Sequence, residues 1–100
     1  MPTSFESRVY SLAKRIPKGM VSTYGEIARK MRTGAYQAVG NALHNNPTPI
    51  IVPCHRVVKS DGSLGGFAGG KKRKILLLKK EGVKVRKGMI ADFERILFRF

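Results

Sequence analysis

Two helix starts with the same spacing constrain this chain more than any other feature. Thr3 and Glu6 have the spacing of a capping box, in which each side chain bonds the backbone N–H of the other residue, and Thr23 and Glu26 repeat that spacing. The first pair predicts a helix that opens at about Ser4, and the second predicts another helix directly after it in the chain.

A short break at Thr33-Gly34 separates the second helix from a third. Apolar residues recur at helical spacing on the inner side of this third helix, at Ala35, Ala38, Val39, Ala42 and Leu43. Helix, glycine turn, helix over about residues 22–45 is typical of a helix-turn-helix, whose second helix reads DNA. Its outward side would carry Tyr36, Gln37, Gly40, Asn41 and His44. An ordinary helical hairpin, with Gly40 chosen for tight packing, explains the same pattern.

Beyond residue 46 the pattern predicts short strands and two further helices. Prolines flank Ile50-Ile51-Val52, which indicates a short buried strand, and Val57-Val58 indicates a second extended piece. Glycines over residues 62–70 predict a flexible loop that a ligand can approach. The remaining expectations are a helix over about Lys71 to Glu81, an extended Val83 to Arg86 and a last helix from about Met89. We therefore expect one domain over residues 1–100, mainly α with short strands.

The net charge of the chain limits the kinds of partner it can be expected to bind. Twenty Lys and Arg against six Asp and Glu give a net charge of +14 on 100 residues. Such an excess is typical of a protein that binds a polyanion, above all nucleic acid, although a solvated basic surface is the alternative. The sequence has no apolar run near the ~20 residues that cross a membrane and no signal pattern. Its single cysteine excludes an internal disulfide and favours an intracellular setting, cytoplasmic or, in a eukaryote, nuclear.

Cys54 is the only cysteine and directly precedes His55, one of only two histidines. A histidine can take the proton of a thiol, directly or through a water, while an acid orients the imidazole. A structural role for the pair is the alternative. Glu81 is the candidate acid because it lies in the last turn of its predicted helix, where the helix dipole disfavours a negative charge. A surface glutamate beside Lys79 and Lys80 is the alternative explanation.

Pro53-Cys54-His55-Arg56-Val57-Val58 resembles the active-site signature of the O6-alkylguanine-DNA alkyltransferases. The resemblance covers about residues 5–85. Residues 21–28 resemble the first DNA-binding helix, 38–40 with 45–47 the recognition helix and the asparagine after it, 60–70 the guanine-pocket loop, and 77–83 the closing helix. It implies a winged-helix-like helix-turn-helix DNA-binding domain, with the active-site segment at 50–58 and the glycine loop at 62–70.

Many members of that family carry a further N-terminal domain. The resemblance therefore implies that this chain is the C-terminal catalytic domain, or a minimal form, of a methylated-DNA–protein-cysteine methyltransferase. Residues 86–100 match no part of the family pattern and are expected to form a C-terminal extension of the same domain.

The activity implied by the resemblance is direct DNA repair, in which the alkyl group of O6-alkylguanine moves to a cysteine once per molecule. The family binds the minor groove and flips the damaged base out. The implied partner is double-stranded DNA containing O6-alkylguanine, bound by a monomer without a membrane, a metal or an organic cofactor. Cys54 would accept the alkyl group, His55 would act as base through a water, Glu81 would orient His55, and Tyr24 would help extrusion and donate a proton.

A further set of residues would contact DNA or the flipped base: Gln37, Tyr36, Asn41, Asn46, Arg56, Phe67, Gly69 and Lys74. Asn46 would also brace the turn after the recognition helix, and the basic residues at 71–74 would hold phosphates. The sequence departs from the family at Gln37, where an arginine usually fills the gap left by the flipped base. It departs again at Gly66-Phe67-Ala68, where asparagine-tyrosine-serine is usual.

Two other functions remain open at this point. One is a relative that binds alkylated guanine with weak or no transfer. The other is a helix-turn-helix transcription regulator, which explains the charge but neither the Cys54 motif nor the glycine loop.

Overall fold

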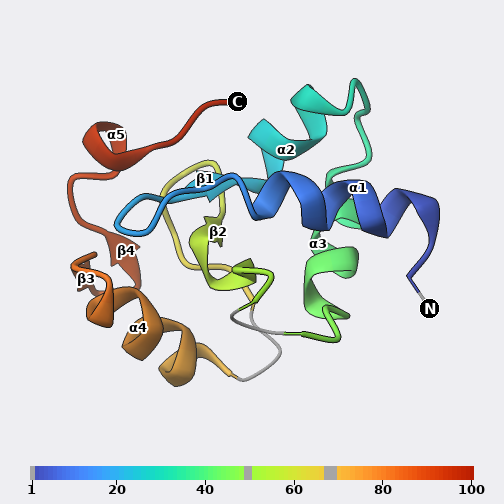
Figure 1. Ribbon diagram of the computed structural model, residues 1–100. Coiled ribbons are helices and arrows are strands. Elements are labelled where there is room, and N and C mark those ends of the chain that lie inside the picture. The colour runs from blue at the N-terminus through green and yellow to red at the C-terminus, as the bar shows by residue number, and fades with distance from the viewer. Residues whose placement is uncertain (1, 49–50, 67–69) are drawn as a thin grey trace.

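The computed structural model describes residues 2–48, 51–66 and 70–100 (Figure 1). Within those ranges the chain forms five α-helices, one 3-10 turn and four strands of two residues each. In chain order they are α1 (Ser4–Ala13), β1 (Ser22–Thr23), α2 (Tyr24–Lys30), α3 (Tyr36–His44), the 3-10 turn η1 (Cys54–Arg56), β2 (Val57–Val58), α4 (Lys71–Lys80), β3 (Val85–Arg86), β4 (Met89–Ile90) and α5 (Phe93–Ile96). The mainly α class with short strands is thus confirmed.

The two predicted caps differ in detail. At α1 the capping box is complete, since the Thr3 N–H donates to Glu6 Oε1 at 2.9 Å and the Glu6 N–H donates to Thr3 Oγ1 at 3.1 Å. Thr23 caps α2 by accepting from the Glu26 N–H at 2.9 Å. The Glu26 carboxylate, however, accepts from Arg29 at 2.7 Å, so only half of the second box forms.

Helices α2 and α3 form the predicted helix-turn-helix, and α1 packs across it (Figure 1). The turn between them places Arg32 in the left-handed region at φ +58°. Helix α3 buries Val39, Ala42 and Leu43, while its outward residues stay exposed or half-buried. A Cβ at Gly40 would meet no described atom within 4 Å, so tight packing does not explain this glycine.

Strand β2 pairs with β1 in parallel, with Ser22 opposite Val57 and Thr23 opposite Val58. This pairing joins the strand that leads into α2 to the strand that leaves η1. The predicted buried strand Ile50-Ile51-Val52 is wrong at Ile51, which lies in a turn and is 71% exposed. Val52 is buried and forms an isolated β-bridge, and its N–H donates to the Thr48 carbonyl. Ile50 lies outside the described residues.

The predicted last helix from Met89 is also wrong, because Met89–Ile90 is a strand paired with Val85–Arg86. Lys87 and Gly88 both have positive φ, +51° and +76°, which is the geometry of a tight hairpin turn. Only Phe93–Ile96 is helical. The chain then returns to β1, where the Phe98 N–H donates to the Val21 carbonyl and Ser22 Oγ donates to the Phe98 carbonyl at 2.8 Å.

The described residues bury two adjoining apolar clusters. The first lies between α1, α2 and α3 and includes Val9, Ile27 and Val39 together with Cys54. The second lies between β2, α4 and the C-terminal hairpin. None of the helices in the described ranges is long and apolar enough to cross a membrane.

One buried hydrogen bond holds the recognition helix on α1. Tyr10, which is 7% exposed, donates its hydroxyl to the Ala42 carbonyl at 2.7 Å. We expect Tyr10→Phe to lower the free energy of unfolding by about 1 to 2 kcal/mol, because the carbonyl loses its partner while the ring still packs. Urea unfolding followed by circular dichroism measures the change. Tyr36→Phe, at an exposed position of α3, is the matched control, and equal losses in the two variants would contradict the assignment.

Candidate active site

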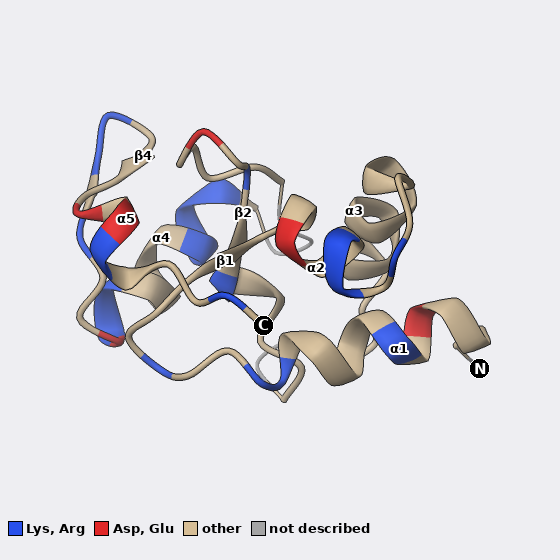
Figure 2. Ribbon diagram, turned by 90° about the horizontal axis from the view of Figure 1, so that it is seen from above, with Lys and Arg blue, Asp and Glu red and all other residues tan. Residues whose placement is uncertain are grey.

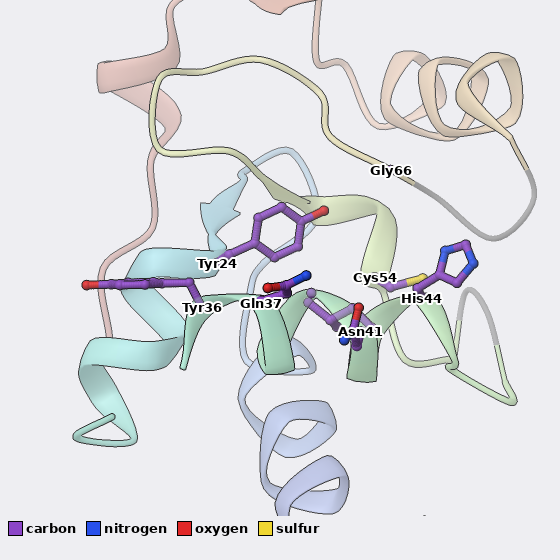
Figure 3. A pocket seen from close by; sticks show the side chains of 9 residues that line it. Tyr24, Tyr36, Gln37, Asn41, His44, Cys54 and Gly66 are labelled. Atoms are coloured by element: carbon purple, nitrogen blue, oxygen red, sulfur yellow. The ribbon is translucent and has the colours of Figure 1, made fainter. Parts of the chain in front are cut away.

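A cavity of about 400 Å³ lies between α3 and the start of the glycine loop, and Cys54 lines it (Figure 3). Its lining residues are Tyr24, Tyr36, Gln37, Gly40, Asn41, Leu43, His44, Cys54 and Gly66. The outward side of α3 forms one wall, and the chain at Gly66 passes on the other side (Figure 3). The structure thus brings together five residues that the sequence predicted as site residues: Tyr24, Tyr36, Gln37, Asn41 and Cys54.

Cys54 opens the 3-10 turn η1, which the Arg56 N–H closes by donating to the Pro53 carbonyl at 2.9 Å. Successive residues in a 3-10 turn are about 120° apart, so adjacent side chains point in different directions. Cys54 is therefore on the cavity side at 4% exposure, while His55 is directed inward to Glu81.

His55, Arg56 and Glu81 form one buried network. Glu81 follows the last residue of α4, and its Oε2 lies 3.1 Å from His55 Nε2. Arg56 grips the same carboxylate with two donors, Nε to Oε1 at 2.9 Å and Nη2 to Oε2 at 2.6 Å. A third donor of Arg56, Nη1, bonds the Ile16 carbonyl at 2.8 Å. The guanidinium offsets the unfavourable helix dipole at Glu81 and fixes the carboxylate against His55.

Burial sets the charge states in this network. Burial alone raises the pKa of Glu81, but hydrogen bonds from Arg56 and His55 outweigh it and leave that pKa below its usual range. Burial lowers the pKa of His55 by more than the hydrogen bond to Glu81 raises it. A neutral imidazole that donates Nε2–H to Glu81 keeps its lone pair on Nδ1. That Nδ1 is buried and has no hydrogen-bond partner among the described residues, so it is available as a base.

Tyr24 lies against the glycine loop from the α2 side. A Cβ at Gly65 would lie 2.9 Å from the Tyr24 hydroxyl, and Gly65 has φ +73°, so only glycine suits this position. Burial raises the pKa of Tyr24, and the nearby Cys54 adds to that shift. The phenol therefore stays protonated at neutral pH and can donate a hydrogen bond into the cavity.

Two predicted DNA contacts are wrong. The guanidinium of Arg56 is engaged by Glu81 and the Ile16 carbonyl and is directed into the fold. Lys74, expected to hold a phosphate, is fully buried. It lies one turn before Leu78 on the inner face of α4, where its ammonium donates to backbone carbonyls. In both cases tertiary packing outweighs the tendency of a long cation to stay in solvent.

Asn46 is buried and braces the turn after α3, as the resemblance implied, with hydrogen bonds to the backbone on both sides of that turn. It is 6% exposed, its Nδ2 donates to the Val52 carbonyl at 2.9 Å, and its Oδ1 accepts from the Thr48 N–H at 3.0 Å. Phe67 and Gly69 lie outside the described residues. Leu43, His44 and Gly66 also line the cavity but were not predicted as site residues, although their neighbours on the same helix and loop were.

Helix α3 itself carries no positive charge. It contains no Lys or Arg, and Figure 2 shows it free of blue along its length. Exposed cations lie instead near the end of α2, at Arg29, Lys30 and Arg32, and at the start of α4, at Lys71, Lys72 and Arg73. A neutral helix with cations on other elements suits a groove between two phosphate backbones.

Known proteins resemble this chain in sequence and in structure. The family described as 6-O-methylguanine DNA methyltransferase, DNA binding domain, matches residues 4–83. The chain belongs to this family. The match includes α1 to α4, η1, β2 and Glu81, and it ends before the C-terminal hairpin.

Three relatives show the extent of the similarity. The methylated-DNA–protein-cysteine methyltransferase of Thermococcus barophilus is 51% identical over 83 residues, which are 82% of this chain and 46% of the relative. The structure of Mycobacterium tuberculosis OGT in complex with DNA has 46% identity and a TM-score of 0.78, covering 81% of this chain and 51% of that one. S. pombe Atl1, in complex with damaged DNA containing O6-carboxymethylguanine, has 31% identity and a TM-score of 0.85 over the full length of both chains. The chain spans about half the length of the curated relatives it matches.

The lowered pKa of His55 predicts that acid destabilises the fold. In the unfolded chain the imidazole takes a proton near its usual pKa of 6.5, whereas the folded state resists protonation until lower pH. Stability should therefore fall as the pH drops from 7.5 to 5, by at most about 1.4 kcal/mol per pH unit for one proton. Urea unfolding across that range measures the slope.

We expect His55→Asn to have a flatter slope, whereas His44→Asn, at the exposed histidine, should keep the parent slope. Glu81 contributes little over this range, because its usual pKa of 4.5 lies below pH 5 and its pKa in the folded state is lower still. Identical slopes for His55→Asn and the parent would show that burial of His55 does not control the pH response.

Proposed function

We propose that this chain repairs O6-alkylguanine in duplex DNA by moving the alkyl group to Cys54 in a single-turnover reaction. The single observation that carries the proposal is the placement of a buried, unpaired thiol in the cavity beside the recognition helix, with a neutral histidine and its carboxylate directly behind it. On this proposal the chain corresponds to the catalytic, DNA-binding portion of the longer alkyltransferases. Residues 1–100 would act as one domain, with residues 86–100 as its C-terminal extension.

The chemistry follows from the geometry. His55 Nδ1 accepts the thiol proton through a water, while Glu81 and Arg56 hold the ring in place. The Cys54 thiolate attacks the alkyl carbon, forms a thioether and displaces the guanine oxygen, which leaves with the bonding electron pair. The departing guanine takes a proton at a ring nitrogen from the Tyr24 hydroxyl, which lines the same cavity, and the proton held on His55 then replaces it through water. Every atom comes from the protein, water or substrate, so the reaction as written needs no metal or organic cofactor.

Recognition of DNA would use the outward side of α3. Tyr36, Gln37 and Asn41 are exposed there, and Gly40 leaves the middle of the helix without a side chain. A narrow, neutral helix of this kind suits the minor groove, from which the damaged base rotates into the cavity. The exposed cations near the end of α2 and at the start of α4 would contact phosphates. A monomer suffices for this arrangement, and its substrate places it in the cytoplasm or, in a eukaryote, in the nucleus.

The relatives support the substrate class. Structures with DNA are known for M. tuberculosis OGT and S. pombe Atl1, and the DNA in the latter contains O6-carboxymethylguanine. The curated relatives at 42% and 51% identity are named methylated-DNA–protein-cysteine methyltransferases. Cys54 in the cavity favours transfer over binding alone, and binding without transfer is an outcome that the next experiment detects.

We expect Cys54→Ser to abolish methyl transfer while leaving duplex affinity within about two-fold, because a serine hydroxyl is a far weaker nucleophile than a thiolate. Transfer is read as loss of O6-methylguanine from a synthetic duplex, and affinity is read by fluorescence anisotropy of the same duplex. Ser11→Ala, at an exposed position of α1 outside the cavity, is the matched control and should keep both transfer and affinity. If the wild-type protein binds the damaged duplex but removes no methyl group, the proposed transfer is wrong and the protein only binds the damage.

Gln37 is exposed and lines the cavity, as the gap-filling position requires (Figure 3). Each ~1.4 kcal/mol of lost support reduces the extruded base population tenfold. We expect Gln37→Ala to slow repair of duplex DNA, and Gln37→Arg to speed it more than repair of single-stranded DNA, where less stacking must be overcome.

Single-turnover rates on both substrates for the three proteins test this role, and the single strand serves as the internal control. If Gln37→Ala leaves the duplex rate unchanged, the gap is filled by another residue, with Tyr36 or Arg32 as the next candidates.

A further inference from the structure

Lys74 is the largest fully buried side chain of the described residues, although it carries an ammonium group. Its Nζ donates to three backbone carbonyls, those of Val57 at 2.7 Å, Leu64 at 2.5 Å and Gly66 at 3.2 Å. An ammonium group has three donors, so each finds one acceptor. Among the described residues no carboxylate pairs with it.

A buried cation without a counter-ion is expensive, and a methyl-ended side chain would fill the same space at lower cost. Burial indeed lowers the pKa of Lys74 to about 8, against an opposing effect of Cys54. The ammonium therefore remains protonated at neutral pH and keeps all three hydrogen bonds. Such a costly group is expected where it fixes a functional position.

The three carbonyls connect two parts of the site. Val57 belongs to β2, directly after the Cys54 turn, and its strand is held by β1. Leu64 and Gly66 belong to the first part of the glycine loop, and Gly66 lines the cavity opposite α3. Leu64 is also held by its own buried side chain and by its N–H, which donates to the Gly88 carbonyl. Gly66 has no side chain, and its carbonyl accepts from Lys74 Nζ. The contacts of Lys74 therefore tie the Gly66 end of this wall to the better-held Leu64 and to β2.

We propose that Lys74 is a positioning residue, whose ammonium group pins the loop at Leu64 and Gly66 to β2 and so sets the width of the cavity between Gly66 and α3. The inference deepens the proposed function, and it rests on that function for its consequence. A guanine in the cavity would lie along this backbone wall, so a shift of about 1 Å there misplaces the alkyl carbon and costs about 100-fold in rate.

Charged and titratable groups lie near Cys54 on several elements. Tyr10 on α1, Tyr24 on α2 and Lys74 on α4 interact with it electrostatically, His44 on α3 lines the same cavity, and His55 follows it in η1. The neighbouring charges of Arg56 and Glu81 pair with each other. An electrostatic effect of Lys74 on the thiol is therefore the competing explanation. Experiment can separate the two roles. If the loop at Leu64 and Gly66 is displaced, only reactions that need the guanine held in the cavity slow down. If the loss of the Lys74 charge changes the thiol, every reaction of Cys54 slows down.

The test compares Lys74→Met with Lys79→Met, an exposed position on the same helix, outside the cations proposed to contact phosphate, that loses the same charge. Four measurements are made on the full chain: amide hydrogen exchange over residues 62–66, methyl transfer from O6-methylguanine duplex, affinity for the same duplex, and reaction of Cys54 with iodoacetamide. In Lys74→Met we expect exchange over 62–66 to rise at least tenfold and transfer to fall about 10- to 100-fold. Duplex affinity and the iodoacetamide rate should match those of Lys79→Met within about two-fold.

Several results would overturn the proposal. Equal exchange in the two variants removes the pinning role, and a parallel loss of iodoacetamide reactivity assigns Lys74 to the thiol. Lys74→Gln, which keeps two donors, should be intermediate in exchange and transfer; if neither variant folds, Lys74 is a folding residue and the proposal is wrong. Should the wild type transfer no methyl group, the proposed function fails, while the hydrogen-exchange comparison still decides whether Lys74 pins the loop.

Discussion

The two-pronged ion pair between the Arg56 guanidinium and the Glu81 carboxylate, called the Arg56–Glu81 fork below, is the interaction on which the rest of the site depends. Glu81 lies at the carboxyl end of α4, where the helix dipole opposes its charge, and both partners are at most 17% exposed. Removing one partner of this largely buried pair leaves the charge of the other without compensation and destabilises the site. The fork joins α4, the Cys54 turn and, through the Ile16 carbonyl, the chain after α1. It also holds the one carboxylate that orients His55.

Parallel pairing of β1 with β2 links this network to the recognition helices. Ser22 and Thr23 bond the strand that leaves η1, and the next residue, Tyr24, opens α2 and lines the cavity. A displacement of the Cys54 turn would therefore move Tyr24 and the helix-turn-helix with it. The C-terminal residues bond the other side of β1 through Phe98, so residues 86–100 brace the same strand although the family match ends at residue 83.

Local signals in the sequence were enough to locate α1 to α4 and to single out Cys54 as the candidate nucleophile. Capping spacings predicted the starts of α1 and α2 because a cap depends on residues three apart, and the dipole conflict at Glu81 pointed to a partner. The helix from Met89 was wrong because pairing with Val85–Arg86 makes Met89–Ile90 a strand, and the strand predicted at residues 50–52 was wrong at Ile51, which lies in a turn. Lys74 was predicted to hold a phosphate because its spacing from Leu78 was overlooked. The two residues are four apart and therefore lie on the same, buried face of α4. The direction of Arg56 depends on where Glu81 and Ile16 meet it, which no local pattern records.

Intact-protein mass spectrometry after incubation with an excess of duplex containing O6-methylguanine tests the central claim most directly. The account predicts that each protein molecule gains one methyl group in place of a hydrogen, that peptide mapping assigns it to Cys54, and that the amount of DNA repaired equals the amount of protein. An unchanged protein mass with the methyl group still on the DNA would contradict transfer. Repair of many duplexes per protein molecule would contradict the permanent thioether.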